Sequence, residues 1–118
     1  MLMNSMPHKD SAPRAELPPG TLEMLILRTI DIEPMHGYSI AQHLHRLSDD
    51  ALKVEEGTLY PALQRILIKG WATAAWRTSS TGRRTRVYTL TSAGRKQLGV
   101  AHANFNAMFA TVSRVMKG

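Results

Sequence analysis

The sequence predicts a mainly α-helical α+β fold with one small β-hairpin, and three observations support this prediction. Apolar residues recur every three to four positions in three short segments near the start of the chain. The same period returns over residues 92–116, the C-terminal part of the chain. Between these segments lie two runs of β-prone residues, joined by a Thr-Ser-Ser-Thr-Gly turn. The length of 118 residues suits one domain, and no apolar run reaches the roughly 18 residues that a membrane helix needs.

The first half of the chain is predicted to hold an arm and two helices. Residues 1–18 are expected to form a flexible N-terminal arm, because prolines and scattered charges interrupt any apolar period. A first helix is predicted over 20–32, and Pro34 is expected to keep it from extending further. A second helix over 37–47 is expected to bury Ile40, Ala41, Leu44 and Leu47. Lys53 and Val54 are expected to form a very short extended piece.

A third helix, a hairpin and a long final helix are predicted to follow. The third helix covers 57–69, with Pro61 tolerated in its first turn and Gly70 ending it. Strands are predicted over 71–77 and 85–91, with Arg83 and Arg84 near the tip of their hairpin. This order of three helices, a hairpin and a helix is that of a winged helix-turn-helix domain, which we assign to residues 19–91.

The final helix, 92–118, carries a coiled-coil-like apolar seam. A seam of this length favours a dimer interface, although it could also pack back on its own domain. A two-fold dimer suits a DNA-binding protein, because two recognition helices then match two half-sites about one helical turn apart. The expected interface residues are Leu98, Ala101, Phe105, Met108, Phe109, Val112 and Val115.

The distribution of charge points to a polyanionic partner. Residues 1–56 hold five basic residues and nine acidic ones, a net charge of −4. Residues 57–118 hold ten basic residues and no acidic one, a net charge of +10. Because such a segment repels itself, a polyanion would stabilise it, and double-stranded DNA is favoured over an anionic membrane.

The third helix and the hairpin supply the candidate DNA contacts. Major-groove recognition needs an exposed polar helix face, and the N–H groups at the start of that helix can also face a phosphate. The hairpin arginines are expected on the flanking backbone or in the minor groove. The candidates on the helix are Thr58, Tyr60, Pro61, Gln64 and Arg65, and those on the hairpin are Arg77, Arg83, Arg84 and Arg86.

Four strings in the chain together resemble PadR-type transcriptional regulators, most closely the group abundant in acidobacteria. These are HGYSI at 36–40, GTLYPAL at 57–63, KGW at 69–71 and YTLTSAGR at 88–95, and the likeness covers about residues 17–116. The resemblance implies a homodimeric repressor that binds an inverted-repeat operator and whose final helix packs against the partner subunit. The chain resembles the short class, which dimerises through one helix.

The resemblance also assigns roles to individual residues. Tyr38 is implied to approach the DNA backbone. Phe105 is implied to lie at the dimer centre, where it is the candidate contact for a small aromatic effector. The recognition helix is implied to contain Thr58, Tyr60, Pro61 and Arg65, and the wing to contain Arg83, Arg84 and Arg86.

Other classes of protein are disfavoured. The chain has no cysteine, which excludes disulfides and thiolate metal sites, and we expect no cofactor and a cytoplasmic location. His43 and His45 are two residues apart on a helix, so they point to different sides and cannot share a metal ion. No catalytic motif is present, so we expect no enzyme. A winged domain used only for protein contacts is the remaining alternative, although such domains often lose the basic wing.

Overall fold

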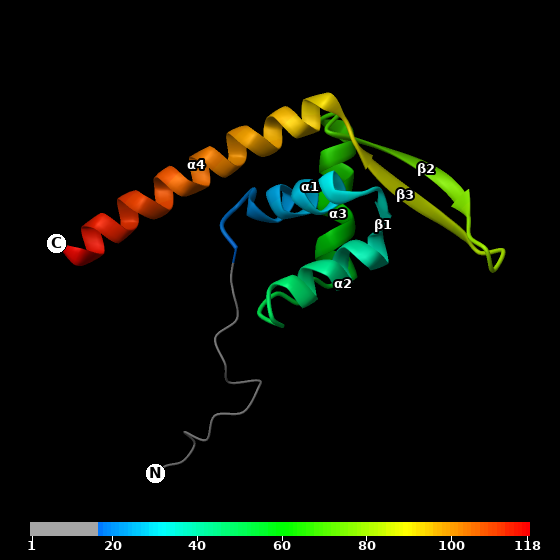
Figure 1. Ribbon diagram of the computed structural model, residues 1–118, viewed down its shortest axis with the longest axis horizontal. Helices are drawn as coiled ribbons and strands as arrows, with labels where there is room; N and C mark the ends of the chain where they lie inside the picture. Colours follow the sequence, from blue (N-terminus) through cyan, green and yellow to red (C-terminus); the bar gives the residue numbers. More distant parts are fainter. Residues whose placement is uncertain (1–16) are drawn as a thin grey trace, which may run out of the picture.

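The computed structural model describes residues 17–118 as helices packed beside a small antiparallel sheet (Figure 1). The predicted arm therefore lies almost entirely outside the described residues. The elements in chain order are α1 (Thr21–Ile32), β1 (Met35–His36), α2 (Gly37–Leu47), α3 (Glu56–Ile68), β2 (Ala72–Thr78), β3 (Arg84–Leu90) and α4 (Ser92–Lys117).

The winged helix-turn-helix prediction is confirmed, and each predicted helix and hairpin strand lies within one residue of its observed bounds. The extended piece expected at Lys53 and Val54 is wrong, because neither residue belongs to a strand. Instead, β1 pairs with β3 through Met35 opposite Tyr88 and His36 opposite Val87. The described sheet thus has the order β1-β3-β2. A strand of two residues is too short to show the alternation that sequence analysis relies on.

The core lies where α1 crosses the other helices and the sheet. α1 contacts α2, α3, α4 and β3, so it is buried on more than its predicted apolar face, and Met24 and Leu27 are buried as well. Ile40 of α2 and Leu63 of α3 are almost fully buried against it. Leu47 was expected in this core, but it is 72% exposed. It is the last residue of α2, where the chain leaves the helix and passes through the left-handed residues Asp49 and Asp50.

A compact joint connects α4 to the rest of the domain. The Thr91 side chain caps α4 by accepting the Gly94 N–H at 3.0 Å, and its hydroxyl donates to the Gly70 carbonyl at 2.7 Å. On α1, Asp31 accepts a hydrogen bond from Arg95 at 3.3 Å. Leu98, in the second turn of α4, packs against the core. Beyond these first turns α4 extends away from the domain (Figure 1).

Candidate nucleic-acid interface

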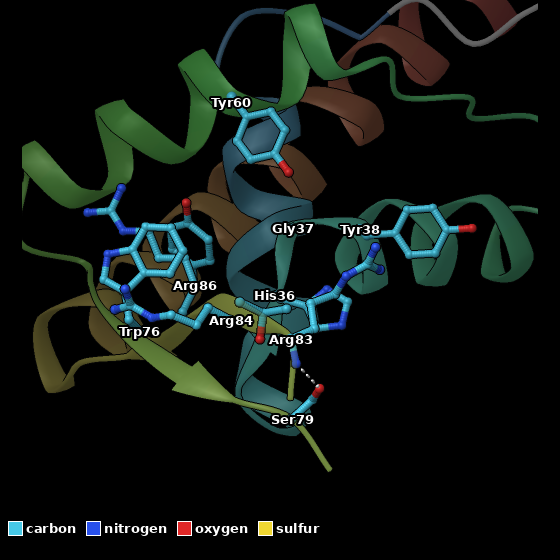
Figure 2. Close-up of a pocket in the computed structure, with 11 residues that line it drawn as sticks. His36, Gly37, Tyr38, Tyr60, Trp76, Ser79, Arg83, Arg84 and Arg86 are labelled. Carbon is cyan, nitrogen blue, oxygen red and sulfur yellow. Dashed lines mark hydrogen bonds between the residues drawn. The ribbon is translucent and has the colours of Figure 1, made fainter. Parts of the chain in front are cut away.

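A hollow of about 650 Å³ lies between the start of α2, the second turn of α3 and the β2–β3 hairpin (Figure 2). Three distant parts of the sequence meet there, because β1 ties the start of α2 to β3. None of the described residues that line it is an Asp or a Glu. They are His36, Gly37, Tyr38, Tyr60, Trp76, Ser79, Arg83, Arg84, Thr85, Arg86 and Tyr88.

Aromatic rings hold two of the arginines in this hollow. The Arg84 guanidinium lies 5.1 Å from the centre of the Trp76 ring, and the Arg86 guanidinium lies 5.9 Å from that of Tyr88. Both arginines remain exposed, so a guanidinium held against a ring can still reach an external anion. Trp76 is itself 60% exposed, which leaves its ring as a platform for Arg84 rather than a part of the core.

Tyr88 forms the floor of the hollow. Its ring is buried, and burial raises the pKa of its hydroxyl because the phenolate form would lose its hydration. Arg86 acts in the opposite direction by favouring the phenolate, and the nearby Tyr60 raises the pKa further. The hydroxyl of Tyr88 therefore stays protonated near neutral pH, and it places no negative charge beside Arg86.

Tyr38 stands at the edge of the hollow, and its hydroxyl points away from the centre (Figure 2). The side chain is 66% exposed. Its hydroxyl accepts a hydrogen bond from Gln42 at 3.0 Å, and its ring stacks beside that of His36 with 6.5 Å between centroids. These two contacts hold the hydroxyl at the rim, facing solvent.

The exposed face of α3 divides the predicted recognition residues into two groups. Successive residues are about 100° apart around a helix, so Tyr60 and Gln64 lie toward the wing, and Thr58 and Arg65 lie toward the other edge. All four residues are exposed, as is Pro61 between the two groups. Only Tyr60 lines the hollow with the wing arginines.

Arg65 is exposed on α3, and it has an acidic neighbour on α1. Its Nε lies 2.6 Å from the carboxylate of Glu23 on α1. Together with Thr58, it lines a separate recess near Pro18 and Glu55. Thr58 and Arg65 are therefore not gathered with Tyr60 and the wing, and Arg65 already has an acidic partner.

The start of α3 is acidic, which argues against the expectation that the N–H groups there face a phosphate. Glu55 is the N-cap residue of α3 and Glu56 is its first residue. Carboxylates there stabilise the helix dipole, but they repel a phosphate. Phosphate contacts are therefore better provided by the hairpin than by the N–H groups of this helix.

Several residues of the hollow were not predicted from the sequence, among them His36, Gly37, Trp76 and Ser79. For the first two there was no periodic signal, because the strand β1 that brings them beside β3 has only two residues. For Trp76 the signal was its register opposite Arg86 in the hairpin. Ser79 shapes the hairpin tip by accepting the Arg83 N–H at 3.2 Å, a contact drawn in Figure 2.

Two further classes of site are absent from the described residues. Over residues 17–118, no group of three or more His, Asp or Glu side chains could hold a metal ion. Every helix in the same range is too short or too polar to cross a membrane.

The predicted seam of α4 has two parts, one packed against its own domain and one exposed. Leu98 packs against the core of its own domain, and Ala101 lines a small recess with residues of α1 and α3. Phe105 is half-buried, and its ring stacks on that of Phe109 with 6.4 Å between centroids. The residues farther along are exposed, namely Met108, Phe109, Val112, Val115 and Met116.

Comparison with known proteins identifies the family of this chain. Residues 26–100 match the model of the transcriptional regulator PadR-like family. A Lysinibacillus sphaericus protein, described only as uncharacterised protein X, is 31% identical over 85 residues, which are 72% of this chain and 78% of that protein. A PadR-like transcription factor from Bacteroides fragilis is 32% identical with a TM-score of 0.67, covering 81% of this chain and 90% of its own.

A PadR-like transcriptional regulator from Bacillus cereus is 28% identical with a TM-score of 0.71, covering 84% of this chain and 94% of its own. The family match spans more than half of the 118 residues and includes all of α2, α3 and the hairpin. The chain therefore belongs to the PadR-like family of transcriptional regulators, and it is a DNA-binding regulator rather than an enzyme.

Proposed function

We propose that this protein is a homodimeric repressor that binds an inverted repeat in double-stranded DNA. The observation that carries the proposal is the hollow in which Tyr60 of α3 meets Arg84 and Arg86 of the hairpin without an acidic residue. In this proposal α3 enters the major groove, and the hairpin lies on the flanking backbone or in the minor groove. Gln64 and Pro61 face the bases, and Tyr38 lies on the backbone at the rim.

The dimer forms through α4 in this proposal. Residues 19–91 are the DNA-binding domain, and residues 92–118 are the dimerisation helix. A row of exposed apolar side chains on a projecting helix is unfavourable in water, and a second copy of the same helix would cover it. Phe105, at the start of this row, remains the proposed contact for a small aromatic effector.

A first prediction concerns the contribution of the wing arginines to DNA affinity. Arg83→Ala combined with Arg84→Ala is expected to weaken binding to all duplexes by a similar factor, because these side chains bind phosphates. If each dimer neutralises about six phosphates, the log–log slope of affinity against salt is expected near −5, and it should flatten by about 1 for each phosphate that is no longer neutralised. Fluorescence anisotropy over a salt series measures both quantities.

A charge-matched control separates the wing from net charge. Arg28→Ala combined with Lys96→Ala removes two positive charges outside the hollow and should leave the salt slope unchanged. If both double variants flatten the slope equally, the arginines act only through net charge. If the native protein shows no salt dependence, a protein-contact role is favoured over DNA binding.

The exposed face of α3 makes a second prediction, about sequence preference. Gln64→Ala is expected to cost about 1–3 kcal/mol on the preferred duplex and little on random DNA, because an amide can bond an adenine edge. Arg65→Ala is expected to leave the preference intact and to lower the free energy of unfolding by about 1 kcal/mol, since it breaks one ion pair with Glu23, whose side chain is only 15% exposed. Selection from a randomised duplex library followed by competition binding measures the preference. An altered preference in the Arg65 variant alone would reverse these roles.

A further inference from the structure

Gly37 and Tyr60 are in unusually close contact. Gly37 is the first residue of α2, and Tyr60 comes from the second turn of α3. A Cβ atom placed on Gly37 would lie 2.8 Å from the Tyr60 hydroxyl oxygen and 3.1 Å from ring atoms Cε1 and Cζ. Favourable contacts between such atoms are at about 3.5–4.0 Å. A side chain at position 37 would therefore require the end of the Tyr60 ring to shift from its present place (Figure 2).

The backbone does not require a glycine at this position. The described glycines with a left-handed φ are Gly20, Gly70 and Gly82, and Gly37 is not among them. Any L-residue could adopt the local backbone, and alanine would favour the helix more than glycine does. The feature of Gly37 that the structure uses is its missing side chain.

This contact connects α3 to the base of the wing. Gly37 directly follows β1, whose Met35 pairs with Tyr88 of β3. The ring of Tyr88 in turn lies under the Arg86 guanidinium. Tyr60 is close enough to Tyr88 to raise the pKa of its hydroxyl. Gly37 thus lies where the recognition helix and the sheet meet, close to Arg86 of the wing.

We propose that Gly37 is a positioning residue for DNA binding, and this proposal rests on the function proposed above. The bare Cα of Gly37 lets the Tyr60 ring dock on the start of α2. The docked ring holds the exposed face of α3 in a fixed orientation to the wing arginines. A side chain at position 37 pushes the ring aside, and α3 and the hairpin then no longer fit one duplex together. The loss falls on the preferred duplex, because random DNA needs only the phosphate contacts.

A double-mutant cycle tests this assignment. The four proteins are the native chain, Gly37→Ala, Tyr60→Ala and the double variant, each measured by urea unfolding and by anisotropy. The probes are a labelled duplex of about 30 base pairs recovered by selection, which accommodates two half-sites, and a random duplex of equal length. Affinity is measured where the urea curves show all four proteins fully folded, so that a purely structural role would leave it unchanged.

We expect Gly37→Ala alone to weaken binding to the selected duplex about tenfold, or about 1.4 kcal/mol, with a smaller loss on random DNA. It should also lower the urea midpoint. In the Tyr60→Ala background the same substitution should cause no further loss of affinity, and it should raise the urea midpoint, since alanine then replaces glycine in a helix with nothing to displace.

Losses that add in the two backgrounds would overturn the proposal, as would an unchanged affinity of the folded Gly37→Ala protein. If the native chain binds neither duplex, the proposed function fails, and the sign change in the urea midpoint still decides whether Gly37 and Tyr60 interact. A midpoint that falls equally in both backgrounds would show that they do not.

Discussion

Gly94→Ala is expected to lower the free energy of unfolding by about 3 kcal/mol and the melting temperature by roughly 10–20 °C. A Cβ atom at this position would overlap the Trp71 carbonyl oxygen and would lie 2.7 Å from a methyl carbon of Leu90. The carbonyl belongs to the backbone and itself accepts the Thr91 N–H at 3.1 Å, so it cannot turn aside as a side chain could. The added methyl group must therefore displace α4 from the hairpin.

Gly99→Ala is the matched control for this prediction. It lies on the same helix, and a Cβ there would have no heavy atom within 4 Å. Alanine at an open helix position is expected to stabilise the protein by about 0.5–1 kcal/mol. Thermal and urea unfolding of both variants measure the contrast. Equal stability of the two variants would mean that α4 does not approach the hairpin this closely.

The packing at Gly94 sets the direction of α4, and this direction is expected to affect DNA binding. α4 has 26 residues, which makes it about 39 Å long. A tilt at its base would move the far end by several ångströms and would change the separation of two recognition helices in a dimer joined through α4. The folded fraction of the Gly94→Ala variant is therefore expected to prefer a different half-site spacing.

The helices and the two hairpin strands could be predicted from the sequence because each of them is long enough to show its period. The apolar rhythm of α1, α3 and α4 and the turn residues at 78–82 placed helices and strands within one residue. The strand β1 could not be predicted in this way, since two residues have no period. Yet β1 brings His36 and Gly37 to the hairpin, and so it builds one wall of the hollow.

Contacts between residues far apart in the sequence were the second feature that could not be predicted. Periodicity indicates that Arg65 is exposed on α3, but not that Glu23, 42 residues earlier, lies against it. The same limit applies to Leu98, where the spacing predicts a seam and the core of the same chain covers the side chain. In both cases the sequence predicts which face of the helix a residue lies on. Which residue packs against that face depends on how the helices cross in three dimensions.

The exposed part of α4 gives the second large prediction. Phe109→Glu is expected to convert the proposed dimer into monomers and to weaken binding to the selected duplex by at least about 100-fold, because a monomer loses the effective concentration of the second half-site. Phe109 is 63% exposed in the single chain, so the substitution should leave the fold of each subunit intact. Light scattering and anisotropy measure the two effects. The Phe105→Glu variant should behave alike, since the two rings are stacked.

Ala110→Glu provides the matched control for Phe109→Glu. It adds the same charge one residue later, and Ala110 is also exposed. Because residues are about 100° apart around the helix, position 110 points away from the row formed by Phe105, Phe109 and Val112. We expect this variant to remain a dimer with native affinity. Monomers in both variants would mean that added charge anywhere on α4 prevents association, and dimers in both would move the interface to another surface. Only the contrast between neighbouring positions places the partner helix on the apolar face.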